Sequence, residues 1–212
     1  MFSLSPTFVE IETPEARNFL DLARAGDTEA FGRICRVYEA PLLRRAMTLC
    51  GNATLAEDLA QEVLVEAWKS LHRYNGRCRF FTWLCAILLN RCRISFRKRR
   101  FRPAFRFGAR DGESDLKSLE QLPDQGFPPD EAAEWVEQKT LVWKCIAALP
   151  AKQRQVVYLR FYADDSLEGI AAALGCPVGT VKSRLFHALD RLRGMSTIHA
   201  QFADLKKKGG AA

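Results

Sequence analysis

The sequence lacks the features that usually identify an enzyme or a metalloprotein. It has only three histidines among its 212 residues, and they are scattered. It contains no glycine-rich phosphate loop, no metal-ligand cluster and no recognisable catalytic carboxylate pair. These absences argue against catalysis, and we predict that the chain is not an enzyme and uses no cofactor and no metal.

The cysteines form an odd set without a CxxC pair, which fits neither a disulfide framework nor a zinc site. The seven are Cys35, Cys50, Cys78, Cys85, Cys92, Cys145 and Cys176. We therefore place the protein in a reducing cytoplasm. Cys85 and Cys92 lie two helical turns apart on a stripe with Leu88 and Phe96, and we predict that they pack in the core. Redox sensing and metal binding are the alternatives.

Long hydrophobic runs are also missing. The apolar run at residues 80–89 is half the length of about 18–20 residues that a bilayer span needs, and it contains Thr82. The N-terminal MFSLSPTFVEIETPE lacks the basic-then-apolar order of a signal peptide. We predict no membrane insertion.

Positive charge is what the sequence has in excess, and its distribution is uneven. The net charge is +7 and the isoelectric point is near 9.2. Two basic blocks, residues 1–102 and 140–212, flank an acidic segment at residues 103–139. This pattern indicates two anion-binding modules joined by a tether.

Helical periodicity dominates, no convincing strand pattern occurs, and we predict an all-α protein of two small helical domains. The expected helices cover residues 13–25, 28–51 with an interruption at Pro41, 54–71 with a cap at Thr54, 81–100, 129–148, 151–162, 166–174 and 179–193. The predicted organisation is a domain at 13–102, a flexible acidic linker at 103–130, a domain at 131–195 and a tail at 196–212 whose role we do not predict.

The segment SLEGIAAALGCPVGTVKSRLFHALDRLR has the pattern of a helix-turn-helix. Asp165 or Ser166 can cap the first helix, and Gly175 can end it in the left-handed conformation. The second helix carries an apolar face and a polar face, which holds Lys182, Ser183, Arg184, Phe186 and His187. An aromatic ring among polar neighbours suits thymine methyl groups in a DNA major groove. An ordinary helical hairpin with a solvated basic face is the alternative.

The helix predicted at residues 54–71 has an acidic and amide strip opposite its apolar side. The strip holds Asp58, Gln61 and Glu62, and Val65 lies among them. An exposed valine within such a strip suits a protein interface, and a solvated face is the alternative.

The helix predicted at residues 81–100 combines aromatic, amide and basic residues on the side opposite its core stripe. They are Trp83, Asn90, Arg91, Arg93, Arg97 and Lys98. Rings can stack on unpaired bases, an amide can read a base edge, and cations can hold the backbone, so we predict binding of single-stranded nucleic acid. Core packing is the alternative for Phe80, Phe81 and Trp83, and it must hold for some of them.

Together, EDLAQEVLVEAWKSL, FFTWLCAILLNRCRISFRKRR and LPAKQRQVVYLRFYADDSLEGIAAALGCPVGTVKSRLFHALDRL resemble a bacterial extracytoplasmic-function (ECF) sigma factor of the sigma-70 family. The resemblance implies a region 2-like bundle and a region 4-like helix-turn-helix. It implies that the strip from Asp58 to Val65 docks on the clamp helices of RNA polymerase. Trp83, Asn90 and the following cations then recognise and melt the minus-ten element, and the residues from Lys182 to His187 read the minus-thirty-five element.

The resemblance further implies three partners: core RNA polymerase through its clamp helices and flap, promoter DNA, and an anti-sigma factor. A stand-alone helix-turn-helix regulator remains the alternative, although it would need neither the acidic strip nor the aromatic and basic helix. One departure is LEGIA, where the family usually has a segment of the kind YEEIA. Gly169 in this segment costs about 1 kcal/mol of helix propensity.

Overall fold

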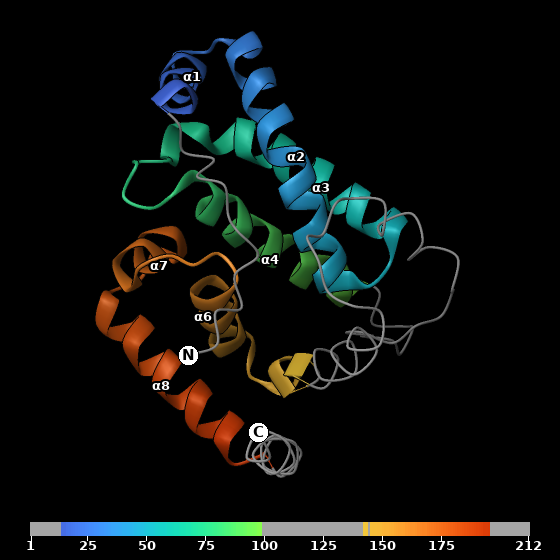
Figure 1. Cartoon of the computed structure of the whole chain (residues 1–212), viewed down its shortest axis with the longest axis vertical. Helices are drawn as coiled ribbons and strands as arrows, with labels where there is room; N and C mark the ends of the chain where they lie inside the picture. The colour runs from blue at the N-terminus through green and yellow to red at the C-terminus, as the bar shows by residue number, and fades with distance from the viewer. Residues whose placement is uncertain (1–13, 99–141, 144, 196–212) are drawn as a thin grey trace, which may run out of the picture.

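The computed structural model describes residues 14–98, 142–143 and 145–195 (Figure 1). Every regular element within these ranges is a helix, which confirms the all-α prediction. No helix in the described part combines the length and the apolar character needed to cross a membrane. The predicted linker at 103–130 and the tail at 196–212 lie outside the described residues.

The helices form two groups, with α1–α4 in the upper part of Figure 1 and α6–α8 in the lower part. The first group comprises α1 (Pro14–Arg24), α2 (Thr28–Cys50), α3 (Ala53–Ser70), the short 3-10 helix η1 (Leu71–Arg73) and α4 (Phe80–Lys98). The second group comprises α6 (Ala151–Phe161), α7 (Leu167–Leu174) and α8 (Val178–Arg193).

Pro41 does not interrupt α2, contrary to the prediction, because the helix continues through it to Cys50. A proline removes only its own backbone bond, here the one to the carbonyl of Val37. Val37 is an exposed residue, so solvent can replace that bond. Tyr38 and Leu42, on either side of Pro41, are fully buried and hold the helix in place.

The cap of α3 also differs from the prediction, since Asn52 and not Thr54 begins the helix. The Asn52 side chain accepts a hydrogen bond from the Leu55 backbone N–H at 2.9 Å. Gly51 ends α2 in the left-handed conformation, with φ of 65°. The end of one helix and the start of the next therefore occupy adjacent residues, which leaves Thr54 inside the first turn.

The helix-turn-helix is confirmed in its elements. Ser166, the second of the two predicted caps, accepts the Gly169 N–H at 2.9 Å and starts α7. Gly175 ends α7 with φ of 61°, and α8 begins directly after Pro177. Ile170 and Val181 are fully buried and join the two helices in one apolar core.

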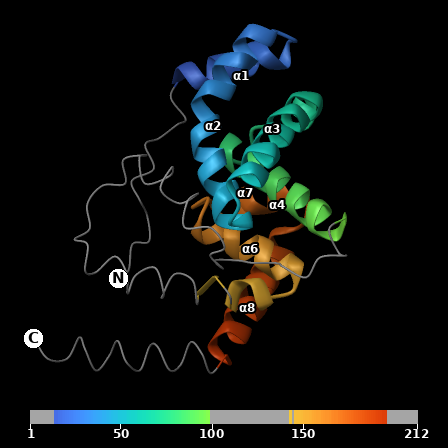
Figure 2. The same cartoon turned by 90° about the vertical axis from the view of Figure 1, so that its right-hand side faces the viewer.

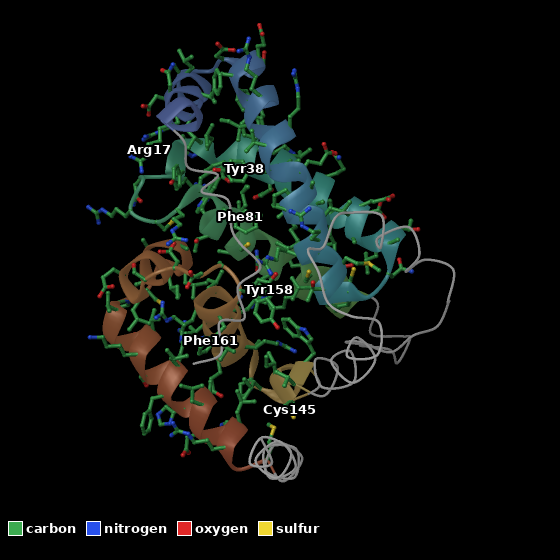
Figure 3. The ribbon with its side chains drawn as sticks, viewed as in Figure 1. Arg17, Tyr38, Phe81, Cys145, Tyr158 and Phe161 are labelled. Carbon is green, nitrogen blue, oxygen red and sulfur yellow. The ribbon has the colours of Figure 1, made fainter. Side chains whose placement is uncertain are left out.

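The two groups of helices pack against each other through α4. Helices α6 and α7 lie against α4 in both views of the ribbon (Figures 1 and 2). Tyr158 of α6 is 1% exposed and lies between α6 and α4, in the middle of the molecule (Figure 3). The buried side chains of both groups form one continuous hydrophobic cluster.

Candidate functional site

Helix α3 presents Asp58, Gln61, Glu62 and Val65 on its exposed side, and we call these four residues the α3 strip. All four are exposed, and Val65 retains 52% of its accessible surface. Their spacing of three and four residues places them on one helix face. Leu59 and Val63 lie on the opposite face and are buried, as predicted.

The α3 strip borders two hollows on the surface. One lies between α2 and α3, where Phe31, Cys35 and Trp68 line it beside Val65. Gln61 Nε2 donates a hydrogen bond across this border to Glu39 Oε1 at 3.2 Å, which ties α3 to α2. Burial, together with the nearby Glu39 carboxylate, raises the pKa of the Cys35 thiol. The strip therefore continues into a groove that is apolar at its floor and acidic at its rim.

Arg91 of α4 lies in the second hollow, next to the α3 strip. It forms an ion pair with Glu66 of α3 and lines a surface hollow together with Asp58, Glu62 and Val65. Arg91 thus stands at the border between the α3 strip and α4. Glu66 was not predicted from the sequence. Its partner lies on another helix, and the periodicity of a single helix does not indicate contacts between helices.

The exposed side of α4 holds Asn90 and Arg93, with Trp83 two helical turns earlier on the same side. We call Trp83, Asn90 and Arg93 the α4 face. Arg93 Nη2 donates to Asn90 Oδ1 at 2.8 Å, and both residues are exposed. Arg97 and Lys98 end α4, but their side chains lie outside the described part of the structure.

The three aromatic residues at the start of α4 divide between core and surface. Phe80 is 1% exposed and Phe81 is 5% exposed, so core packing holds for both of them. Trp83 is only half-buried, and its ring lies 5.4 Å from that of Tyr74 and 5.5 Å from that of Phe80. Trp83 therefore packs against the core and keeps part of its surface accessible to solvent.

Helix α8 presents the predicted residues Lys182, Ser183, Arg184, Phe186 and His187, which we call the α8 face. Phe186 is 65% exposed and makes an edge contact with the His187 ring at 5.6 Å. Arg184 is half-buried and its Nη1 lies 3.8 Å from the Cys176 sulfur in the turn. Val181 and Ala188 are fully buried on the opposite side. The described positions of the α8 face agree with the predicted helix wheel.

Asp165 was expected only as a possible cap of α7, and the structure gives it a different position. It is buried, with 6% exposure, and its Oδ2 accepts the backbone N–H of Arg79 at 3.3 Å. Arg79 directly precedes α4, so this bond joins the two groups of helices. Sequence reasoning could not find the bond, because its partners are 86 residues apart.

Comparisons with known proteins follow the same division into two groups. Residues 35–102 match the family model of Sigma-70 region 2, and residues 145–194 match that of Sigma-70, region 4. The first match contains the α3 strip and the α4 face, and the second contains the α8 face. The two matches occur in the chain order that the resemblance implies.

Similarity to individual proteins extends over most of the chain. The ECF RNA polymerase sigma factor SigW of Bacillus subtilis is 30% identical, over 80% of this chain and 90% of that protein. The ECF RNA polymerase sigma factor RpoE of Cereibacter sphaeroides is 32% identical, over 79% of this chain and 86% of that protein.

Two solved structures share the fold. The sigma factor RpoE of Bartonella quintana, solved with the anti-sigma factor NepR, is 26% identical with a TM-score of 0.52 and covers 78% of this chain and 96% of its own. CnrH, solved with the cytosolic domain of CnrY, is 22% identical with a TM-score of 0.55, over 84% of this chain and 95% of its own. On the sequence relatives and the two region matches together, this chain belongs to the ECF RNA polymerase sigma factors.

Proposed function

We propose that this sigma factor directs core RNA polymerase to promoters with two elements and helps to open them, with a separate task for each of the three surfaces. The observation that carries the proposal is the arrangement of the α3 strip, the α4 face and the α8 face. Each is the exposed side of a helix whose other side is buried, so its polar and aromatic residues are available to a partner.

The α3 strip is the proposed contact with the clamp helices of the polymerase. Its two carboxylates and one amide suit a basic or amide-rich partner, and Val65 supplies the apolar centre of the contact. The neighbouring groove, with Trp68 and Phe31, offers further apolar area next to Val65. Residues of this type around a small apolar centre are typical of specific protein interfaces.

The α4 face is the proposed site for the non-template strand of the minus-ten element. Trp83 can stack on an unpaired base, and Asn90 can read a base edge by its amide. Arg93, Arg97 and Lys98 are assigned to the phosphate backbone. Arg91 is assigned to the same backbone from the border of the α3 strip, where its pair with Glu66 fixes its position.

The α8 face is the proposed reader of the minus-thirty-five element in the major groove. Lys182 and Arg184 can reach base edges or phosphates, and Ser183 and His187 can add hydrogen bonds. Phe186 is the apolar contact for thymine methyl groups. The Phe186 side chain is 65% exposed. This exposure supports the role, because an aromatic ring contributes to stability when it is buried, and contact with DNA would bury it.

We further propose the organisation that these roles require: a region 2 domain at 13–102, a linker at 103–130 and a region 4 domain at 131–195. Tethering raises the effective concentration of the second contact once the first has formed. The polymerase flap and an anti-sigma factor complete the proposed partners. A cytoplasmic location and the absence of catalysis of its own follow from such a role.

The test is run-off transcription with purified bacterial core polymerase on genomic DNA from the source, with and without the protein. New transcripts that start downstream of a shared two-part sequence are the expected result. If no transcripts appear while the protein alone binds duplex DNA, the chain acts as a stand-alone helix-turn-helix regulator and the roles of the α3 strip and the α4 face are wrong.

A further inference from the structure

Glu39 of α2 contacts the α3 strip, although the strip was predicted from α3 alone. Gln61 Nε2 donates a hydrogen bond to Glu39 Oε1 at 3.2 Å, and the two residues are 22 positions apart in the sequence. Both side chains are exposed. They line the same groove beside Val65, between α2 and α3. The bond therefore lies within the surface that the proposed function assigns to the polymerase.

The chemistry of this bond fixes the orientation of the Gln61 amide. A carboxylate only accepts hydrogen bonds, whereas an amide has a donating NH2 group at one end and an accepting carbonyl oxygen at the other. Glu39 therefore binds the NH2 end of the amide and directs the carbonyl oxygen, Oε1, away from itself. The negative charge of Glu39 also acts within the groove, because burial raises the pKa of the Cys35 thiol and this charge raises it further. Gln61 thus offers its accepting end to a partner.

The other polar residues of the α3 strip accept hydrogen bonds as well. Asp58 and Glu62 are exposed carboxylates, and neither takes part in an ion pair with any residue that the structure describes. The carboxylate of Glu66, one turn further along α3, is already paired with Arg91. With Gln61 Oε1 added, the strip presents acceptors around its apolar centre. Guanidinium and ammonium groups are the donors that bind such acceptors most strongly.

The exposed position of the Glu39–Gln61 bond determines which property it controls. In the free protein water competes for both groups, so the bond adds little to the free energy of unfolding. In a complex the partner excludes water, and a bond to a charged group becomes stronger where the local dielectric is low. Without Glu39, the donating end of the Gln61 amide could turn toward the donors of the partner. The effect of Glu39 therefore belongs to the affinity for the polymerase and not to folding.

We propose that Glu39 is a positioning residue of the polymerase contact. It holds the Gln61 amide so that Oε1 joins the carboxylates of Asp58 and Glu62 as an acceptor for arginine or lysine side chains of the clamp helices. The inference rests on the proposed function, because it assumes that the α3 strip docks on these helices. It adds α2 to the contact and states the chemical class of the partner's side chains.

An exchange of the two groups tests the positioning role. The full chain is made with Glu39→Gln, with Gln61→Glu and with both substitutions. Glu39→Gln leaves two amides, which can pair in either orientation, and Gln61→Glu leaves two carboxylates, which repel each other. In the double variant the amide and the carboxylate have exchanged helices, so the bond forms again with an acceptor on α3.

Fluorescence anisotropy with purified core polymerase measures the affinity of each labelled chain. Each single variant is expected to bind about tenfold more weakly, the scale of one hydrogen bond to a charged group, and the double variant is expected to recover most of that loss. The urea midpoints should stay close to that of the wild type, because the bond is exposed in the free protein. Single variants that bind like the wild type, a double variant without recovery, or urea midpoints that fall in parallel with the affinity overturn the positioning role.

Glu29→Gln is the matched control. It removes the same charge from the exposed side of α2, where Glu29 is paired with Arg33 at 3.0 Å and does not line the groove. The affinity for the polymerase should not change. An equal loss of affinity in this control would show an effect of net charge and overturn the role of Glu39.

The chemical class of the partner is tested on the polymerase side. Each arginine and lysine of the clamp helices is changed singly to alanine, and each polymerase variant is measured with the wild-type chain and with Gln61→Ala. At least one of them should show losses of affinity that are not additive with Gln61→Ala. Additive losses throughout overturn the assignment to arginine or lysine. Failure of the proposed function is a separate result, since the wild-type chain then does not bind core polymerase or stays inactive in run-off transcription.

Discussion

Thr82 lies fully buried in α4, and its hydroxyl has no hydrogen-bond partner among the described residues. A desolvated polar group without a partner lowers stability. Thr82→Val keeps the shape and the β-branching and removes the hydroxyl. We therefore expect the free energy of unfolding to rise by about 1 kcal/mol, as measured by urea denaturation.

Thr48→Val is the control for this prediction. The Thr48 hydroxyl donates to the Arg44 carbonyl at 2.9 Å, so the same substitution removes a bond that exists. We expect no gain in stability at residue 48. Equal effects of the two substitutions would show that the buried hydroxyl of Thr82 carries no cost.

At the scale of single helices, α3 and α4 should separate polymerase binding from promoter opening. Val65→Glu places a charge at the apolar centre of the α3 strip and should weaken binding to core polymerase by tenfold or more, which is about 1.4 kcal/mol. Val37→Glu is the matched control, because Val37 is a valine of similar exposure on α2, at 45% against 52% for Val65, and lies outside the strip. Fluorescence anisotropy with labelled protein measures the affinity.

Changes to the α4 face should have the opposite pattern. Asn90→Ala and Trp83→Ala are expected to lower the formation of open complexes and to leave the affinity for core polymerase unchanged. Permanganate reactivity of unpaired thymines measures the opening. Normal promoter melting by both variants would remove the α4 face from the proposed site.

At the scale of the whole molecule, buried thiol and phenol groups lie at the interface between the two groups of helices. Burial raises the pKa of the Cys85 thiol and of the Cys92 thiol from the ordinary 9.0 to about 12. Burial also raises the pKa of Tyr162 from 10.0 to about 12, while the charge of Arg45 opposes the shift. These groups stay protonated in the folded protein at pH values where the unfolded chain releases its protons.

Alkaline conditions should therefore destabilise the protein. Between about pH 9 and pH 12 the unfolded state binds fewer protons than the folded state. The free energy of unfolding therefore falls by up to about 1.4 kcal/mol per pH unit for each thiol. Below about pH 9 the thiols are protonated in both states, and their contribution to stability is fully present. Urea midpoints at about pH 8 and about pH 10 measure the loss. A variant with Cys85→Ala and Cys92→Ala should show a smaller loss, and an identical loss would contradict the assignment.

Local patterns in the sequence were enough to predict most helices and the exposed faces of α3, α4 and α8. Helical periodicity depends on neighbours three and four residues away, so Val65 and Phe186 could be recognised as exposed apolar residues. Pro41 was misjudged because the packing of Tyr38 and Leu42 outweighs one lost backbone bond. The cap of α3 was misplaced because the left-handed Gly51 brings the end of α2 next to Asn52.

Helical periodicity in the sequence was sufficient to predict which side of each helix is apolar, whereas the residues that cover that side became known from the folded structure. Cys85 and Cys92 were predicted to be buried, and they are, yet part of their cover is Tyr158 from the other group of helices. The pairs Arg91–Glu66 and Arg79–Asp165 likewise join residues far apart in the chain. Periodicity reports an average preference for burial, whereas a contact between distant residues exists only once the whole chain has packed.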